Sequence, residues 1–352
     1  MSSCGKEIRE NSGLPTGIQV AKIDNSSTTD PFRSAWWCPG PHLQTLWPQL
    51  SRRLPRLRYQ REVLDLPDGD FVDVDWIHHN NPRAIAILIH GLGGHSRSPY
   101  IRGLAHRLNT AGYRIAALNM RGASGRPNRR PRTYHSGHTE DLDYLIRQIK
   151  TRFTATPIVC VGYSLGGNLL LKWLGEYPEK ARIRAAAAVS VPFLLGQTAD
   201  RMNRGFSKIY QYKLLSDLKS STRLRRRLFK GRINLEAALE AGEFRQFDNA
   251  LTAPLNGFAN AEHYYARCSC RQYLSRIQSP TLIIHSLDDP FMTVDTVPDK
   301  DEFSDSIRAD IFPKGGHVGF IDSKFPGLSG CWLDKRITEY FDDQLEINRD
   351  TG

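Results

Sequence analysis

Apolar residues along the chain are grouped in two ways, as short continuous runs and as stretches with helical spacing. The runs at residues 84–90, 157–161 and 281–285 have the length and composition of strands that are buried on both faces of a sheet. Residues 100–108 and 139–149 instead repeat apolar positions every three or four residues, which predicts amphipathic helices. Strands that alternate with helices in this order favour a mostly parallel sheet with helices on both faces.

The N-terminal part of the pattern predicts antiparallel strands. Residues 59–66 and 71–77 alternate apolar and polar positions around a Pro-Asp-Gly-Asp turn, which is a signal for a β-hairpin. We expect these two segments to be the antiparallel edge strands of the sheet. Asp73 and Asp75 fall on one face of the second strand, and we expect that face to be solvated rather than to hold a metal.

The alternation of strands and helices stops after residue 191 and resumes near residue 280. The segment between has helical patterns and no stretch with the composition of a core strand, so we expect a helical lid insertion at residues 193–279. It divides one α/β core into residues 31–192 and 280–346, while the polar residues 1–30 are expected to form a mobile tail. Aromatic residues of the lid are candidates to line a pocket, although most are expected to pack the lid onto the core: Phe193, Phe206, Tyr210, Tyr212, Phe244, Phe247, Phe258, Tyr264 and Tyr265.

The composition suits one large globular domain with an insertion, since the 352 residues are 40% hydrophobic. No run reaches the ~20 apolar residues that a membrane-spanning helix needs. The six cysteines have no metal-binding spacing, and the sequence contains neither a zinc-protease motif nor a phosphate-binding loop motif. We therefore expect no metal and no cofactor, and a reducing, cytoplasmic compartment.

The net charge of +11 is concentrated at residues 126–132 and in the lid. Such an excess suits a solvated basic surface, weak contact with an anionic membrane surface, or binding to nucleic acid. No RNA-binding motif or set of stacking residues accompanies the charge, so nucleic acid is not an expected partner. Peripheral contact with an anionic membrane stays a hypothesis. The sequence leaves the oligomeric state open.

A candidate nucleophile lies where the run at residues 157–161 passes into a helix. The turn at residues 162–166 reads Gly-Tyr-Ser-Leu-Gly, and strand, sharp turn and helix in this order are the context of a nucleophile elbow. The glycines leave room for a strained turn that holds Ser164 out of the sheet, near the amides of the helix N-terminus. The alternative is a loop that only connects the strand to the helix.

A serine hydroxyl needs a base, and the base needs an orienting carboxylate. Asp288 and Asp289 follow the run at residues 281–285, at the edge of a parallel sheet where functional groups gather. Asp289 is preferred because Pro290 fixes the backbone directly after it, and Asp288 stays open. Of eleven histidines, only His317 follows the acid in a glycine-rich loop past a late strand. It is the candidate base, with a surface-loop histidine as the alternative.

The loop after the run at residues 84–90 reads Gly-Leu-Gly-Gly and is a candidate oxyanion hole. The amide N–H of Leu92, together with that of Leu165 after the serine, can stabilise the oxyanion of a tetrahedral intermediate. His90 precedes the glycines and lies upstream of the serine, so we expect it to be a structural hydrogen-bonding residue.

Together these motifs resemble the YheT-like esterase branch of the α/β-hydrolase superfamily, which includes yeast medium-chain ethyl-ester synthase/hydrolases. The resemblance extends from about Trp36 to the last helix, with matching stretches at residues 41–45, 90–94, 119–122, 162–168, 288–291 and 315–320. It implies the α/β-hydrolase fold and a serine hydrolase of carboxylic esters, with Ser164, Asp289 and His317 as the matched triad.

The expected function is hydrolysis of small-molecule esters with short- to medium-chain acyl groups through an acyl-enzyme. Acyl transfer to an alcohol needs the same residues and stays open. A non-catalytic binding module built on a hydrolase fold is the third alternative.

Overall fold

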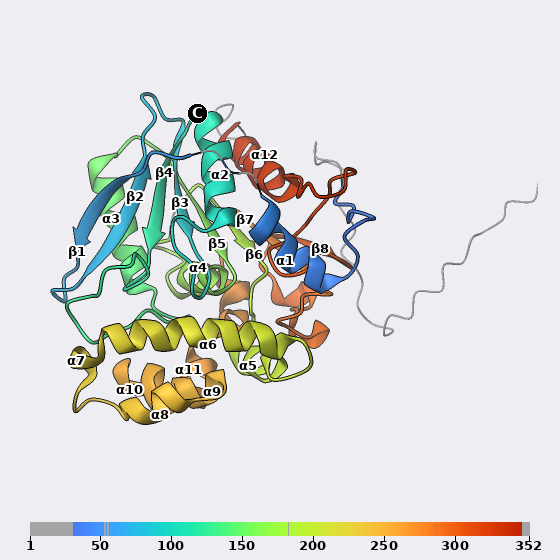
Figure 1. Cartoon of the computed structure of the whole chain (residues 1–352). Coiled ribbons are helices and arrows are strands. Elements are labelled where there is room, and N and C mark those ends of the chain that lie inside the picture. The colour runs from blue at the N-terminus through green and yellow to red at the C-terminus, as the bar shows by residue number, and fades with distance from the viewer. Residues whose placement is uncertain (1–30, 53, 55, 182, 347–352) are drawn as a thin grey trace, which may run out of the picture.

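The computed structural model describes residues 31–52, 54, 56–181 and 183–346, so the predicted tail at residues 1–30 lies outside the described residues. An eight-stranded sheet with the order β1-β2-β4-β3-β5-β6-β7-β8 forms the centre of the protein (Figure 1). β2 runs antiparallel to both of its neighbours, and all other neighbouring strands are parallel. The strands are β1 (Gln60–Asp65), β2 (Phe71–Ile77), β3 (Ala84–Ile89), β4 (Tyr113–Asn119), β5 (Ile158–Tyr163), β6 (Ala185–Val189), β7 (Thr281–Ser286) and β8 (Ile307–Phe312). This arrangement confirms the predicted fold class.

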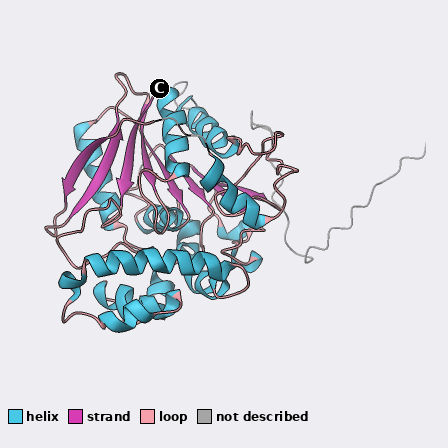
Figure 2. Cartoon of the chain, in the orientation of Figure 1, coloured by secondary structure: helices cyan, strands magenta, loops and turns pink. Residues whose placement is uncertain are grey.

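Helices cover both faces of the sheet (Figure 2). α2 and α12 share one apolar core with one face, and α3 and α4 share a second core with the other face. The helices outside the insertion are α1 (Pro41–Ser51), α2 (Pro99–Thr110), α3 (Glu140–Arg152), α4 (Leu165–Glu176) and α12 (Trp332–Glu346), with short 3-10 turns at η3 (Val294–Thr296) and η4 (Lys300–Glu302). The two layers of helices explain why the inner strands are apolar on both sides.

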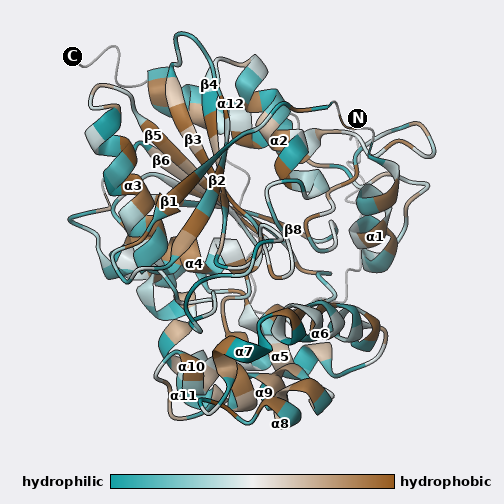
Figure 3. Ribbon diagram, turned by 60° about the vertical axis from the view of Figure 1, so that its left-hand side comes forward, coloured by the Kyte–Doolittle hydropathy of each residue, from teal (hydrophilic) through white to brown (hydrophobic). Residues whose placement is uncertain are grey.

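Burial follows the position of each strand in the sheet. Every residue of β3, β5, β6 and β7 is buried, and Figure 3 shows β3 and β5 in the brown of apolar residues. None of the six residues of the edge strand β1 is buried. The sequence pattern does not predict β6, because four of its five residues are alanines and alanine prefers helices to strands.

The prediction that this face of β2 is solvated is wrong, since Asp73 and Asp75 are each only 1% exposed. Arg61, the register partner of Asp75 in β1, binds that carboxylate through Nε at 2.7 Å and Nη2 at 2.8 Å. Arg126 binds the carboxylate of Asp73. Paired charges can be buried where single charges cannot. Part of the basic charge at residues 126–132 is thereby neutralised.

The elements between β6 and β7 are all helical and form the helical insertion (residues 195–276). In Figure 1 the insertion lies along one edge of the sheet, with the long α6 crossing below the strands. Two small apolar cores hold its helices together. Its elements are α5 (Leu195–Met202), α6 (Ser207–Leu224), α7 (Arg226–Phe229), α8 (Leu235–Glu240), α9 (Phe244–Phe247), η1 (Asp248–Thr252), α10 (Ala253–Leu255), α11 (Ala261–Cys268) and η2 (Cys270–Arg276). Within the described ranges, no helix has both the length and the apolar composition of a membrane span.

Candidate active site

Ser164 lies at the turn between β5 and α4. Its backbone has φ 51° and ψ −120°, a conformation that residues with a Cβ rarely adopt. The two glycines allow the turn, because a Cβ on Gly162 would lie 2.3 Å from the carbonyl oxygen of Gly166, and one on Gly166 would lie 2.5 Å from that of His90. The Ser164 N–H donates to the carbonyl of Val189 in β6 at 2.8 Å. The turn therefore has the geometry of a nucleophile elbow.

Two loops bring a histidine and a carboxylate to the serine. The loop after β8 places His317 Nε2 3.0 Å from Ser164 Oγ, although the residues are 153 positions apart. The loop after β7 places Asp289 Oδ2 2.7 Å from His317 Nδ1. His317 and Asp289 are 8% and 3% exposed, and Phe291 stacks on the imidazole with 3.9 Å between ring centres. The structure thus brings together the three residues that the sequence singled out.

Asp288, the alternative acid, binds a different group. Its Oδ1 accepts the backbone N–H of Gly316 at 2.9 Å, and burial raises the pKa of its carboxyl group. Gly316 has φ +63°, and a Cβ there would lie 2.6 Å from the carbonyl oxygen of Pro41. Asp288 therefore fixes the loop that carries His317, while Asp289 contacts the imidazole itself.

Helix α1 supports the loop that carries His317, a contact that the sequence pattern does not predict. Thr45 Oγ1 accepts the backbone N–H of His317 at 2.9 Å and donates to the carbonyl of Pro41 at 2.7 Å. Gln44 is fully buried, and its Oε1 accepts the N–H of Ile321 at 2.7 Å. The only signal in the sequence was the polar motif at residues 41–45, and its composition does not show what these side chains bind.

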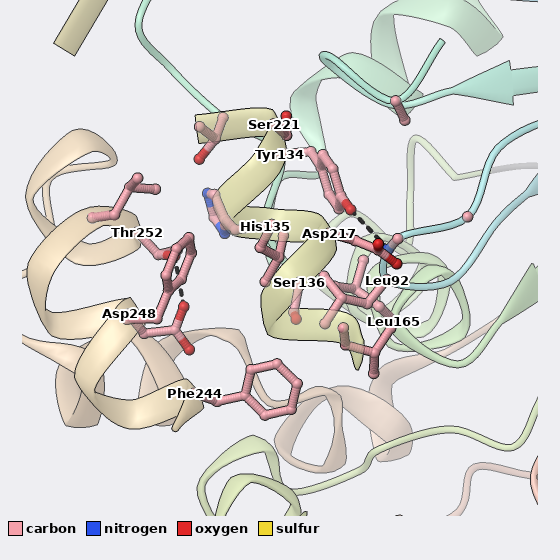
Figure 4. A pocket seen from close by; sticks show the side chains of 18 of the residues that line it. Leu92, Tyr134, His135, Ser136, Leu165, Asp217, Ser221, Phe244, Asp248 and Thr252 are labelled. Carbon is pink, nitrogen blue, oxygen red and sulfur yellow. Dashed lines mark hydrogen bonds between the residues drawn. The ribbon is translucent and has the colours of Figure 1, made fainter. Parts of the chain in front are cut away.

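The loop between β3 and α2 carries Leu92, one of the two predicted oxyanion-hole residues. The neighbouring amides are occupied, since Gly91 donates to the hydroxyl of Tyr100 and Gly93 to that of Tyr134, each at 3.0 Å. Within the described part of the chain, the Leu92 N–H has no such acceptor. Figure 4 shows the bond that the hydroxyl of Tyr134 accepts, close to Leu92. This amide is therefore available to a ligand.

Leu165 and His90 complete this end of the site. Leu165 is the first residue of α4, and N–H groups of a first helical turn lack an intrahelical acceptor. His90 is fully buried, with Nδ1 2.7 Å from the carbonyl of Gly91 and Nε2 3.2 Å from the N–H of Met120. Since the Met120 N–H can only donate, Nε2 carries no proton, and burial lowers the pKa of His90 to about 4. This geometry matches the expected structural role of His90.

Ser164 lines a cavity of about 350 Å³ between the core and the helical insertion. Most of its lining is apolar. Figure 4 shows part of the wall of this cavity, with Leu92 and Leu165 close together and Phe244 and Asp248 on the helical insertion. α6 lies close to the loop that carries Leu92, since a Cβ on Gly93 would be 3.4 Å from Leu214 Cδ2. Four of the nine aromatic residues that were candidates for a pocket line this cavity: Phe244, Phe247, Tyr264 and Tyr265. In the ranges that the structure describes, no group of three or more His, Cys, Asp or Glu residues is placed to hold a metal ion.

Comparison with known proteins shows the family. Residues 87–324 match the family described as alpha/beta hydrolase fold. The chain is 38% identical over 340 residues to "Putative esterase YheT" of Escherichia coli (strain K12), covering 94% of this chain and 98% of that protein. It is 27% identical over 328 residues to "Phospholipase ABHD3" of Bos taurus, covering 90% and 80%. It is 29% identical over 284 residues to "Monoacylglycerol lipase" of Saccharomyces cerevisiae, covering 77% of this chain and 62% of that protein.

A solved structure has the same fold. The Pyrococcus furiosus esterase Pf2001 superposes with a TM-score of 0.54 and 17% identity, covering 90% of this chain and 100% of that chain. At this identity the likeness concerns the fold alone. The family match and the similarity to YheT confirm the resemblance that the motifs indicated. The chain belongs to the α/β-hydrolase family, in the esterase branch that contains YheT.

Proposed function

We propose that this protein is a serine hydrolase that cleaves carboxylic esters with short- to medium-chain acyl groups. The observation that carries the proposal is the hydrogen-bond network of Ser164, His317 and Asp289. The distance is 3.0 Å from Ser164 Oγ to His317 Nε2 and 2.7 Å from His317 Nδ1 to Asp289 Oδ2. Ser164 and His317 of this network line a largely apolar cavity. Relatives that are named esterase, phospholipase and monoacylglycerol lipase support an ester as the substrate class.

In the first half of the proposed reaction, Ser164 Oγ attacks the carbonyl carbon of the ester. His317 Nε2 accepts the hydroxyl proton, and Asp289 holds the proton on Nδ1 and stabilises the imidazolium that forms. The tetrahedral intermediate collapses when the bond to the alcohol breaks, and His317 gives its proton to the leaving alkoxide oxygen. An acyl-enzyme on Ser164 remains.

In the second half, a water molecule takes the place of the alcohol. His317 Nε2 accepts a proton from the water as its oxygen attacks the acyl carbon, and the same proton returns to Ser164 Oγ when the acid leaves. In both halves we propose that the N–H groups of Leu92 and Leu165 stabilise the oxyanion. Removal of one such donor typically costs about 10²–10³ in turnover.

The cavity supports the proposed acyl range. Its volume of about 350 Å³ is at the small end of ligand pockets, which typically span about 300–1,000 Å³. Aromatic side chains from α9 and α11 and aliphatic side chains from α5 and α6 line it, and such apolar side chains suit contact with an alkyl chain. We propose that the helical insertion serves as a lid that encloses this chain.

Substitution of the serine tests the proposal. Ser164→Ala should lower the turnover of p-nitrophenyl butyrate by ~10⁴ or more, with the melting temperature little changed. Ser220→Ala, on the exposed face of α6, is the matched control and should keep its activity. Equal activity of the Ser164→Ala and wild-type proteins would contradict the proposal. Excess ethanol in the assay separates hydrolysis from acyl transfer, because transfer would produce ethyl butyrate.

We also propose weak contact between α6 and anionic membrane surfaces, with a cytoplasmic, peripheral location. Ile209 and Tyr212 on this helix are 57% and 78% exposed, and Phe206 directly before it is 45% exposed. Lys208 and Lys219 lie on the same helix. Exposed apolar residues beside lysines suit the interface of an anionic bilayer. Sedimentation with phosphatidylserine liposomes at low salt tests this proposal, which fails if Ile209→Glu binds as well as the wild type.

A further inference from the structure

Arg225 is a buried cation in the wall of the cavity that holds Ser164 and His317. It lies at the junction of α6 and α7 and is only 7% exposed. Its Nε and Nη1 atoms are buried and have no hydrogen-bond partner among the described residues. In the same ranges the guanidinium takes part in no ion pair. A guanidinium stays charged in proteins, so this side chain presents an unneutralised positive charge.

The groups around Arg225 do not neutralise it. Phe229 lies under the guanidinium, with 5.3 Å from Cζ to the ring centre, which leaves the N–H edge free. Gly122 lets the guanidinium approach the backbone, because a Cβ there would lie 3.2 Å from Nη1 and also 3.2 Å from Asn128 Oδ1. No hydrogen bond joins that amide oxygen to the guanidinium.

Two carboxylates in this region, Asp70 and Asp217, have partners of their own. Burial lowers the pKa of Arg225, while the electrostatic influence of Tyr134 and of Asp70 favours its protonated form. Asp70 itself binds Arg121 at 3.3 Å and accepts the side-chain N–H of Asn128 at 2.9 Å. Asp217, which also lines the cavity, binds Lys213 at 2.7 Å. Neither acid is bonded to Arg225.

A buried charge without a partner costs stability, and a folded protein gains nothing from it unless a ligand binds there. Arginine binds carboxylate and phosphate oxygens through two parallel N–H groups, and such bonds are strong where water is excluded. We propose that Arg225 binds an anionic group of the substrate, a carboxylate or a phosphate, in the cavity that holds Ser164. The inference rests on the proposed function. It narrows the substrate class to esters that carry a negative charge away from the scissile bond.

The anionic group could belong to the acyl chain or to the alcohol, and two substrate pairs separate these sources. The first pair is p-nitrophenyl butyrate and the p-nitrophenyl monoester of glutaric acid, whose acyl chain ends in a carboxylate. The second pair is butyrylglycerol and butyrylglycerol phosphate, whose alcohol carries the charge. The full chain is assayed as wild type, Arg225→Gln and Arg225→Lys. Arg227→Gln removes the same charge from an exposed position of α7 and is the matched control.

We expect Arg225→Gln to lower kcat/KM for the anionic member of one pair by about 10- to 100-fold, the loss expected for a charged hydrogen bond. The loss for the neutral member should be far smaller. Arg225→Lys should retain part of the anionic preference, and Arg227→Gln should retain all of it. The pair that responds identifies the side of the ester that carries the charge. Equal losses on both members of each pair, or no loss on either, would overturn the inference.

Stability and binding distinguish this inference from its alternatives. Because the cation has no hydrogen-bond or ion-pair partner to lose, Arg225→Gln should keep or raise the melting temperature, and a fall of several degrees would indicate a structural residue and overturn the proposal. Calorimetric titration of Ser164→Ala with the same esters measures binding without turnover. Tighter binding of one anionic ester that disappears in Ser164→Ala/Arg225→Gln supports the inference, even if wild-type hydrolysis proves independent of Ser164 and the proposed function fails. Equal binding of neutral and anionic esters overturns it.

Discussion

Asparagine in place of Asp289 tests which carboxylate serves the histidine. Asp289 Oδ2 lies 2.7 Å from Nδ1 of His317, and Oδ1 accepts the N–H of Phe291 at 2.8 Å. In Asp289→Asn the amide oxygen should stay on the Phe291 N–H, so that the NH₂ group faces Nδ1. An NH₂ group only donates, so Nδ1 must become the acceptor and the ring proton must move to Nε2. There it prevents the histidine from accepting the proton of Ser164.

The expected loss of turnover is large because the His317 imidazole keeps its position but carries its proton on Nε2, the atom that must accept the proton of Ser164. The corresponding Asp→Asn substitution in a Ser-His-Asp triad lowers kcat by about 10⁴, which is about 5 kcal/mol of activation free energy. We expect a fall of this size for Asp289→Asn on p-nitrophenyl butyrate at pH 8. The melting temperature should change little, because asparagine has nearly the shape of aspartate.

Asp288→Asn is the matched control for this prediction. Its amide oxygen can still accept the N–H of Gly316, which is the bond that Asp288 Oδ1 makes. Only the charge on the acceptor is lost, so we expect kcat to fall by less than about tenfold. Equal losses in the two variants, or a larger loss in Asp288→Asn, would refute the assignment of the acid.

Three further predictions follow from single contacts. Thr45→Val leaves the N–H of His317 buried without an acceptor. The free energy of unfolding in urea should therefore fall by about 1–3 kcal/mol, and kcat should fall as well. Unchanged values of both would contradict the supporting role of α1. Gly166→Ala places a Cβ 2.5 Å from the backbone carbonyl oxygen of His90. The variant should therefore lack esterase activity even where it is recovered in soluble form, and a fully active variant would rule out this elbow geometry. Burial raises the pKa of Asp248 to about 6, so the folded state binds this proton more tightly than the unfolded state. Asp248 therefore contributes stability that is lost as pH rises from about 4 to about 6. Asp248→Asn removes this contribution, so the slope of the free energy of unfolding against pH in this range should be more positive in the variant than in the wild type, and equal slopes would contradict the shift.

The sheet and the candidate site could be predicted because their signals are local. A continuous apolar run, a turn with glycines at fixed positions and a helical pattern lie next to one another around Ser164. The same holds for the loops that carry Asp289 and His317, which each follow a strand directly. Parallel strands end at one edge of a sheet, so topology alone brings three distant loops together.

The features that escaped prediction depend on contacts between distant segments. Burial of Asp73 and Asp75 depends on the register with β1 and on Arg126, 53 positions away from Asp73. The support that Thr45 gives to His317 joins residues 272 positions apart. In the sequence, Arg225 is one of three consecutive arginines, and only the packing of α6 and α7 on the core shows which of them faces the cavity. Periodicity and composition carry no information on such pairings.

Labelling with a fluorophosphonate probe tests whether Ser164 is an activated nucleophile, because the probe reacts only with a serine that a neighbouring base activates. The labelled protein is digested with trypsin, and the modified peptide is mapped by mass spectrometry. We expect a single adduct on Ser164, in the peptide of residues 153–172, and its loss in Ser164→Ala and His317→Ala. An adduct at another residue, or undiminished labelling of Ser164→Ala, would contradict the assignment of Ser164 as the nucleophile.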